Sequence, residues 1–385
     1  MKSAFLRFGI ISIISLVFSC APDKSSEEDR ETTLLLLYNS YVATEGIVYS
    51  GSGSERTAIY YKKVGTGIPV VVLHGGPGLD HNYLVQPLSE LLGSNHQLIF
   101  FDQRGTGFSR GEFSDLNAGF INKTKFLEDL EAVRVGLNLG DKINILGHSW
   151  GGLYAMLYAS NDSYKAHVKS LALVGSSGAH YNYYGIFLLN NLINKAGGEA
   201  AAATLGNLGA PLNPSSANYL PTLNALKAYY SFLFKFYFAD YTPINTQNGT
   251  SANFAKLNLG LSAEKTIRNG LAVGSLINLS LRIADDDLTA GFFSNTKNTH
   301  NIVADLAKIT VPVKLIHGAD DVIPASFVIN TGETYFTGTV PSSPVSVQTG
   351  LTNATVTTHL ISNCGHFPFL EQPEAFRTAL SGFFQ

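Results

Sequence analysis

A serine stands at the centre of the segment 147–151, Gly-His-Ser-Trp-Gly, where its hydroxyl could act as a nucleophile. The preceding residues 143–146 are mostly apolar, and an Ala-, Leu- and Tyr-rich stretch follows as far as Ala159. A strand, a sharp Gly-x-Ser-x-Gly turn and a helix hold such a serine in a strained backbone with its hydroxyl exposed. The backbone N–H of Trp150, at the helix N-terminus, would be placed to bind an oxyanion. An isolated Gly-x-Ser-x-Gly is often only a flexible turn, but this context favours Ser149 as a nucleophile.

An acid and a base occur downstream, each just after a short apolar run. Asp320 and Asp321 follow the run 313–318, and His366 follows the run 358–361. A histidine can take the serine proton as general base, while a carboxylate orients it and stabilises the imidazolium that forms. The chain order is therefore serine, aspartate, histidine. The residues alone leave open which of the two adjacent aspartates is the acid.

Alternating apolar runs and amphipathic stretches predict the elements that position these groups. The run 69–73 is continuous, as expected for a buried parallel strand, and leads into the Gly-rich loop 74–78. In an open parallel sheet the active site forms at the carboxyl ends of the strands, where the three candidate side chains fall. The alternation predicts an α/β fold with a doubly wound, mostly parallel sheet flanked by helices. We expect a hairpin over 47–64, strands over 69–73, 97–101, 143–146, 168–174, 313–318 and 358–361, and helices over 84–92 and 126–139.

Four segments together resemble the proline iminopeptidase-like branch of the α/β-hydrolases, the S33 serine peptidase group. The resemblance covers residues 46–175 and 301–385, and it implies the α/β-hydrolase fold with a mainly helical cap inserted over 176–300. The order serine, aspartate, histidine is also that of the α/β-hydrolase triad. The matching segments are His-Gly-Gly-Pro-Gly at 74–78, Asp-Gln-Arg-Gly-Thr-Gly-Phe-Ser at 102–109, Gly-His-Ser-Trp-Gly-Gly at 147–152 and the run 365–374, with Asp129, Glu131 and Arg134 before the serine's strand.

The resemblance implies a triad of nucleophile, acid and base, together with two N–H donors for an oxyanion. Family members usually place the acid three residues after the glycine that ends the strand, which selects Asp321 after Gly318. The spacing to Pro324 instead fits Asp320, which stays as the alternate acid. No metal-ligand spacing occurs in the sequence, and we expect no cofactor. The predicted set is Ser149, Asp321 and His366, with the backbone N–H groups of Gly76 and Trp150 as the oxyanion donors.

The predicted cap, 176–300, bears on the substrate class. Within it we expect a helix over 225–238 and a loop over 207–221. It is rich in aromatic side chains, above all between 229 and 238, where a pocket lining and a packed helix are both possible. Proline iminopeptidases usually carry a Trp- and Glu-containing cap motif that binds the substrate's free amino group, but Trp150 is the only Trp of this chain. We therefore expect a serine hydrolase that acts on small-molecule or short-peptide substrates, as esters or amides, through an acyl-enzyme.

Two other functions remain open. The first is a proline iminopeptidase-type aminopeptidase, in which Glu199, Glu264 or the aspartates at 285–287 would supply the carboxylate for the amino group. The second belongs to a different class: a catalytically silent, hydrolase-like binding lipoprotein. Such proteins usually lose a member of the triad, whereas here every role has a candidate.

The composition excludes other classes of partner. Charged residues make up 14% of the 385 residues and the formal net charge is −3, so we expect no basic surface and no nucleic-acid partner. Only two cysteines occur, Cys20 and Cys364, and Cys364 is expected to be a small buried residue. No pattern in the sequence indicates the oligomeric state.

The N-terminus has the pattern of a targeting signal. Lys2 and Arg7 precede an apolar stretch, 8–18, that is too short to span a bilayer. The stretch stops at Cys20, which resembles the lipidated first residue of a bacterial lipoprotein. We therefore predict a signal over 1–20, a solvated tether over 21–45 and a lipid anchor in a membrane of the cell envelope. The alternative is an exported protein that is secreted or periplasmic and soluble.

Overall fold

The computed structural model describes most of the chain from Thr44 onward, and this part forms one compact unit. The residues described are 44–53, 56–76, 79–109, 122–179, 191–192, 194–212, 217–218, 223–240, 301–332 and 346–385. The predicted signal, with Cys20, and residues 21–43 of the predicted tether lie outside these residues. So do Glu264 and the aspartates at 285–287. The last two residues of the predicted tether, Thr44 and Glu45, belong instead to the first strand, where they pair with Lys63 and Lys62.

Eight strands of the described residues form a single sheet in the order β1-β2-β4-β3-β5-β6-β7-β8. The first two strands pair antiparallel, β2 pairs antiparallel with β4, and the remaining neighbours are parallel. This is the mostly parallel α/β-hydrolase sheet that the sequence predicts. The strands are β1 (Thr44–Ser50), β2 (Thr57–Val64), β3 (Ile68–Leu73), β4 (His96–Phe101), β5 (Ile143–His148), β6 (Val168–Val174), β7 (Val313–Gly318) and β8 (Val356–Ile361).

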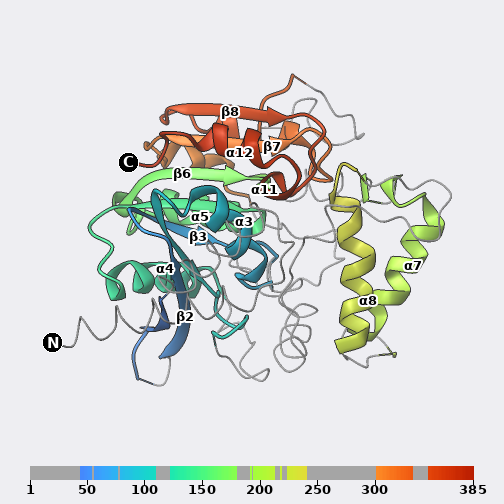
Figure 1. The fold of residues 1–385 in the computed structure, drawn as a ribbon, viewed down its shortest axis with the longest axis horizontal. Coiled ribbons are helices and arrows are strands. Elements are labelled where there is room, and N and C mark those ends of the chain that lie inside the picture. The colour runs from blue at the N-terminus through green and yellow to red at the C-terminus, as the bar shows by residue number, and fades with distance from the viewer. Residues whose placement is uncertain are drawn as a thin grey trace, which may run out of the picture. The chain divides into compact units, whose positions relative to one another are not determined.

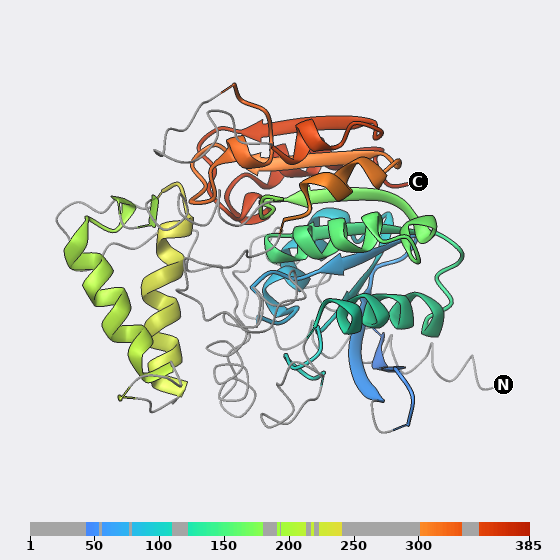
Figure 2. The ribbon, with the colours of Figure 1, turned by 180° about the vertical axis from the view of Figure 1, so that it is seen from behind.

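Helices cover both faces of this sheet. In Figure 1 the helices α3 (Asn82–Leu92) and α12 (Pro373–Leu380) lie on one face, with the short α11 (Pro368–Glu371) beside them. Figure 2 shows α4 (Lys123–Gly136) and α5 (Trp150–Ser160) on the opposite face. Short elements between them are η3 (Lys165–His167), η7 (Val303–Lys308), η8 (Ala325–Phe327) and α10 (Val347–Gly350).

The strand and helix on either side of Ser149 form the centre of the core. Every residue of β5 is buried, and so is every residue of α5. A helix that is apolar on all sides has no solvent face, which suits its position between the sheet and η7. Because both elements are completely buried, neither can shift without disturbing the core, and the turn between them is therefore fixed at both of its ends.

Between β6 and β7 the chain leaves the sheet and forms further helices. Two of them, α7 (Glu199–Gly209) and α8 (Leu223–Leu233), pack against each other and lie side by side in both views (Figures 1 and 2). They are followed by the 3₁₀ turns η4 (Ala210–Leu212) and η5 (Phe234–Tyr237), respectively. No helix of the described residues is long and apolar enough to cross a membrane.

The helix boundaries differ from the sequence expectation in three places. The helix expected over 126–139 begins at Lys123, where the Asn122 side chain caps it, and ends at Gly136 because Asn138 takes a left-handed φ of 52°. The loop expected over 207–221 is wrong at its start, since α7 and η4 continue to Leu212. The helix expected over 225–238 stops at Leu233. From there the chain continues as the 3₁₀ turn η5, and the Phe238 N–H bonds back to the Lys235 carbonyl.

Candidate active site

The turn at Ser149 has the strained geometry of a nucleophile elbow. Ser149 takes φ 57° and ψ −122°, a region that L-residues rarely adopt. Its N–H donates to the Val174 carbonyl at 3.0 Å, and its carbonyl accepts the N–H groups of Gly152 at 2.9 Å and Ser177 at 3.2 Å. These three backbone bonds hold the turn, while the side chain remains partly exposed. The hydroxyl is thus presented to solvent by a fixed backbone.

Small residues are required around this turn. A Cβ on Gly147 would clash with the Gly151 carbonyl, and a Cβ on Gly151 would clash with the carbonyl of Leu73. Because β5, the turn and α5 approach this closely, only glycine fits at either position. The Gly-x-Ser-x-Gly spacing therefore has a steric reason in this fold.

Asp321 and His366 lie together at the carboxyl ends of β7 and β8. The Asp321 Oδ2 atom is 2.8 Å from Nδ1 of His366, and both side chains are almost fully buried. The other carboxylate oxygen, Oδ1, accepts the N–H of Ile323 at 3.0 Å. With the acceptor Asp321 at Nδ1, the proton of a neutral His366 is held on Nδ1 and Nε2 is left as the basic nitrogen. Gly175 lies against this pair, where its Cβ would meet the His366 carbonyl at 3.0 Å and Nδ1 at 3.3 Å.

A second imidazole faces the same carboxylate. His317, inside β7, places Nε2 3.3 Å from Asp321 Oδ2 and 2.8 Å from the Ile323 carbonyl. Since a carbonyl only accepts, Nε2 carries the proton, and the buried Nδ1 has no hydrogen-bond partner among the described residues. Burial alone would raise the pKa of Asp321, but His366 and His317 hold that pKa below its usual value. Burial lowers the pKa of His317 itself, so it faces Asp321 as a neutral donor.

The alternate acid, Asp320, is placed differently. Its side chain is exposed, and its contacts come from its backbone: its N–H donates to the Cys364 carbonyl at 2.9 Å. Its own carbonyl accepts the Lys195 ammonium at 2.6 Å. The geometry thus brings Asp321, and not the Asp320 carboxylate, to His366. This agrees with the position three residues after Gly318.

The His366 loop is bonded to the segment after α8. The Tyr237 carbonyl accepts the N–H of His366 at 2.7 Å. Glu371 accepts three further N–H groups, from Ala239 at 2.8 Å, Gly365 at 3.0 Å and Phe367 at 3.2 Å. These bonds join the end of η5 to the His366 loop. They also fix the position of the His366 backbone, because the N–H groups of residues 365, 366 and 367 are all bonded.

The loop after β3 is linked to the elbow by hydrogen bonds through Gln103. The indole Nε1 of Trp150 donates to Oε1 of Gln103 at 3.0 Å, and the Gln103 amide donates to the His74 carbonyl at 2.8 Å. Next along this loop, Gly75 is buried and Gly76 is exposed with a φ of 122°. This φ favours glycine and lets the loop turn at the position predicted for an oxyanion donor.

The loop after β4 holds Gln103 in place. The buried Asp102 carboxylate accepts N–H groups of His81 at 3.1 Å and Phe108 at 2.7 Å. Arg104 forms a bidentate, buried ion pair with Asp129 of α4, at 2.7 Å and 2.6 Å. Asp102 and Arg104 therefore support the structure of this loop and are not reacting groups.

Two residues near Asp321 and His366, His317 and Glu371, had no assigned role in the sequence, and Tyr237 was placed only in the aromatic run 229–238. His317 carries the one available signal, a histidine inside an otherwise apolar strand end. Glu371 and two of its partners, Gly365 and Phe367, lie in the segment 365–374, but its third partner, Ala239, is 132 residues away in the sequence. Tyr237 packs edge-on against the His366 ring, with ring centroids 5.0 Å apart. That contact cannot be read from sequence spacing.

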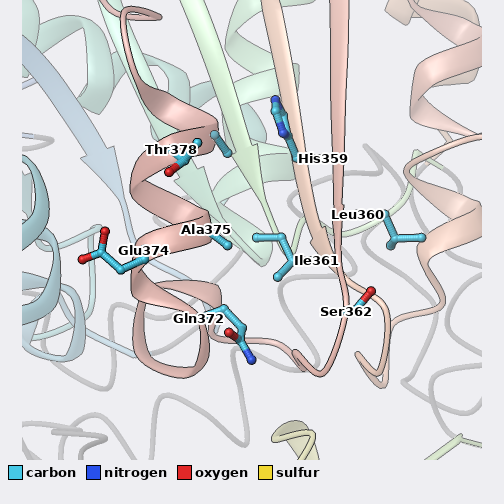
Figure 3. Close-up of a pocket in the computed structure, with 9 residues that line it drawn as sticks. His359, Leu360, Ile361, Ser362, Gln372, Glu374, Ala375 and Thr378 are labelled. Atoms are coloured by element: carbon cyan, nitrogen blue, oxygen red, sulfur yellow. The ribbon is translucent and has the colours of Figure 1, made fainter.

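Other candidate sites do not reach this centre. Cys364 is buried and its pKa is raised, first by burial, so it stays a neutral thiol. Within the described residues no cluster of His, Cys, Asp and Glu could hold a metal ion. A groove of about 500 Å³ lies between β8 and α12, where Ile361 and Ala375 face each other (Figure 3). Its lining includes none of Ser149, Asp321 and His366, so the groove is a separate surface feature.

Comparison with known proteins agrees with this architecture. The chain is 40% identical over 104 residues to a proline iminopeptidase of Clostridioides difficile (strain 630), covering 26% of this chain and 34% of that protein. A proline iminopeptidase of Lactobacillus crispatus (strain ST1) is 37% identical over 119 residues, covering 30% and 39%. The chain thus spans less than half the length of these curated relatives.

The fold comparison extends further along the chain. The crystal structure of proline iminopeptidase from Mycobacterium smegmatis matches 88% of this chain and 97% of its own, with a TM-score of 0.55 at 19% identity. At that identity the match establishes a shared fold and nothing finer. The profile described as "Alpha/beta hydrolase family" matches residues 70–379, which include the elbow, both loops after β3 and β4, and the His366 loop. The chain belongs to the alpha/beta hydrolase family.

Proposed function

We propose that this protein is a serine hydrolase in which Ser149 is the nucleophile, His366 the general base and Asp321 the acid that orients it. The observation that carries the proposal is the 2.8 Å pair of Asp321 and His366 together with a serine at φ 57°, whose neighbour His148 lies 2.9 Å from the His366 carbonyl. A strained elbow and an oriented imidazole are the two parts that this chemistry needs.

The reaction follows from those positions. His366 Nε2 takes the proton of the Ser149 hydroxyl as Oγ attacks the substrate carbonyl, and a tetrahedral oxyanion forms. The imidazolium, stabilised by Asp321, then gives that proton to the leaving alcohol or amine, and an acyl-serine remains. Water attacks the acyl-serine with His366 again as base, which releases the acid and restores the serine.

The oxyanion donors in this proposal are the backbone N–H groups of Gly76 and Trp150. Trp150 is the first residue of α5, so its N–H lies among those that have no partner within the helix. The partial positive charge at a helix N-terminus favours a developing negative oxygen. Gly76 follows a loop that is bonded to Gln103 and therefore fixed relative to Trp150.

We propose small esters or amides with an apolar acyl group as substrates. The support comes from the aromatic side chains near His366: Tyr237 lies edge-on to its ring, and Phe234 packs near Phe367. Phe236 packs with Leu192 and Val322, and Phe238 is fully buried, so those two serve as core. An apolar, aromatic wall favours uncharged groups.

The second candidate function is release of an N-terminal residue, as in the proline iminopeptidases to which the chain is similar. It needs a free carboxylate near the site for the substrate's ammonium group. Among the described acids close to His366, Glu371 already accepts three N–H groups. The Glu371 carboxylate is therefore engaged by the backbone, while the exposed Asp320 side chain, next to Asp321, is an acid that an ammonium group could reach.

Steady-state kinetics on two substrate series tests the proposal. Purified protein is assayed with p-nitrophenyl esters of increasing acyl length and with prolyl- and alanyl-naphthylamides, alongside Ser149→Ala. We expect the short esters to give the higher kcat/KM, and Ser149→Ala to lose activity by about 10⁶-fold in kcat, down to the background. Prolyl-naphthylamide cleaved far faster than any ester would overturn the substrate assignment. Undiminished turnover by Ser149→Ala would overturn the mechanism.

We also propose that Cys20 is lipidated and anchors the protein to a membrane of the cell envelope. The support is the position of Cys20, which is separated from the apolar stretch 8–18 by Ser19 alone. Two or three acyl chains on one cysteine suffice for stable anchoring. Partition into the detergent phase, lost in Cys20→Ser, is the expected result, and a wild-type protein that stays in the aqueous phase would contradict it.

A further inference from the structure

His148, the residue before Ser149, makes two buried hydrogen bonds whose direction the chemistry fixes. Its Nε2 is 2.9 Å from the carbonyl oxygen of His366, and its Nδ1 is 2.8 Å from the Tyr83 hydroxyl oxygen. A carbonyl can only accept, so Nε2 carries the proton and Nδ1 is the bare, accepting nitrogen. Tyr83 must therefore donate its hydroxyl proton to His148.

The Tyr83 hydroxyl has a second partner. Its oxygen accepts the N–H of Gly75 at 2.7 Å, and the Tyr83 ring, on α3, is 2% exposed. The four groups form one chain with a single direction: Gly75 N–H to Tyr83, Tyr83 O–H to His148 Nδ1, and His148 Nε2–H to the His366 carbonyl. No member is left with an unused donor, which is the condition under which a buried polar network has one arrangement.

Packing and burial keep the His148 ring uncharged and hold this series of hydrogen bonds in place. Phe367 stacks on the His148 ring with centroids 5.4 Å apart, and Phe369 meets it edge-on at 5.2 Å. Burial lowers the pKa of His148 to about 3, so the ring stays uncharged at neutral pH. The loop after β3 lies close to Ser149, because a Cβ added to Gly75 would lie 2.9 Å from the Cβ of Ser149.

This chain of hydrogen bonds joins the three loops that the proposed function uses. Gly75 precedes Gly76 in the loop after β3, His148 precedes Ser149 in the elbow, and the His366 carbonyl belongs to the loop of the general base. We propose that Tyr83 and His148 are positioning residues, which hold the oxyanion loop and the His366 loop at fixed distances from Ser149. The inference rests on the proposed serine-hydrolase function and adds two residues to it, neither of which touches the substrate.

The test removes one hydroxyl. In Tyr83→Phe the N–H of Gly75 and Nδ1 of His148 both lose their partner, while the ring still fills its place. We expect kcat for a p-nitrophenyl ester to fall about 10- to 100-fold with KM changed less than about threefold, since a small misplacement of reacting groups costs this much. An arylboronic acid, which mimics the tetrahedral intermediate, should bind more weakly by a similar factor.

Tyr154→Phe is the matched control. Tyr154 is also a buried tyrosine, on α5, and its hydroxyl donates to the Phe126 carbonyl on α4, away from the three loops. Both variants should lose stability in urea unfolding, but Tyr154→Phe should keep the wild-type kcat and boronate affinity. A purely structural role for Tyr83 would make the two variants alike.

The outcomes separate this inference from the proposed function. Wild-type kcat and boronate affinity in folded Tyr83→Phe would overturn the positioning role while leaving the serine hydrolase intact. A wild-type protein without esterase, amidase or boronate binding would overturn the proposed function. The ¹⁵N spectrum of imidazole-labelled protein, assigned with His148→Gln, still tests the chain in that case. We expect His148 protonated on Nε2 and bare on Nδ1, and the opposite tautomer would overturn the network.

Discussion

Replacing Asp321 by asparagine removes one charge and inverts one hydrogen bond, with an outcome that the geometry determines. Ile323 donates its N–H to Oδ1 at 3.0 Å, so the asparagine carbonyl oxygen stays at that position. The amide nitrogen then stands where Oδ2 was, 2.8 Å from His366 Nδ1 and 3.3 Å from His317 Nε2. An amide nitrogen donates, so it binds His366 only when Nδ1 is bare and the proton sits on Nε2. That tautomer has no lone pair for the Ser149 proton.

The expected loss in kcat is about 10⁴-fold, as for the same change in an unrelated serine triad. It corresponds to about 5 kcal/mol of lost transition-state stabilisation. The assay is steady-state hydrolysis of a p-nitrophenyl ester, with the fold checked by circular dichroism and urea unfolding. Burial alone would raise the pKa of Asp321, but His366 and His317 hold it below its usual value, so wild type carries the negative charge at neutral pH. Asparagine has no titratable group, so raising the pH should not recover the loss.

Asp320→Asn is the control within the same loop. The Asp320 side chain is exposed, and its backbone bonds to Cys364 and Lys195 survive the substitution. We expect its kcat to stay within about threefold of wild type, as for most exposed substitutions. A larger loss at Asp320 than at Asp321, or an Asp321→Asn enzyme that keeps a tenth of the activity, would refute the assignment of the acid.

Two further predictions concern stability. In Glu371→Gln the amide nitrogen must face at least one of the three backbone N–H groups that the carboxylate accepts, so we expect the free energy of unfolding in urea to fall by about 1–3 kcal/mol, and an unchanged midpoint would contradict the role of Glu371. Burial lowers the pKa of His74 to about 4 and that of His148 to about 3, from 6.5. The unfolded chain therefore binds more protons below pH 6.5, and the free energy of unfolding should decline as the pH falls from 6.5 to 4, by several kcal/mol in total. A flat profile over this range would contradict it, and His74→Gln should show a shallower decline than wild type.

The strands and the elbow could be predicted because their cause is local. Buried parallel strands are continuous apolar runs, and every strand expected between Pro69 and Ile361 is present within two residues of its expected bounds. The glycines around Ser149 are fixed by close approach of β5 and α5, which leaves a short, readable pattern. Helix ends are harder to predict, because both Gly136 and Asn138 tolerate the left-handed conformation that ends a helix, and the sequence does not say that Asn138 is the one that adopts it.

The support around the site could not be predicted, because its bonds join residues that are distant in sequence. His366 bonds to Tyr237, which lies more than a hundred residues earlier, and Tyr83 bonds to His148 on another element. The residues alone leave the choice between the adjacent aspartates open in the same way, and only the spacing of the resembling family selects Asp321. In the structure the turn after Gly318, packed against Gly365, decides which carboxylate points inward. Residues that position a site are selected by tertiary contacts, and their spacing carries no periodic signal.

The central claim is that Ser149 is a nucleophile activated by His366, and covalent labelling tests it most directly. Folded wild type, Ser149→Ala and Asp320→Asn are incubated with a fluorophosphonate, and the adduct is located by intact mass and peptide mapping. A serine hydrolase is labelled once, at its activated serine. We predict a single adduct on the peptide that contains Ser149 in wild type and Asp320→Asn, and none in Ser149→Ala. Absence of an adduct in folded wild type, or an adduct that persists in Ser149→Ala, would contradict the claim.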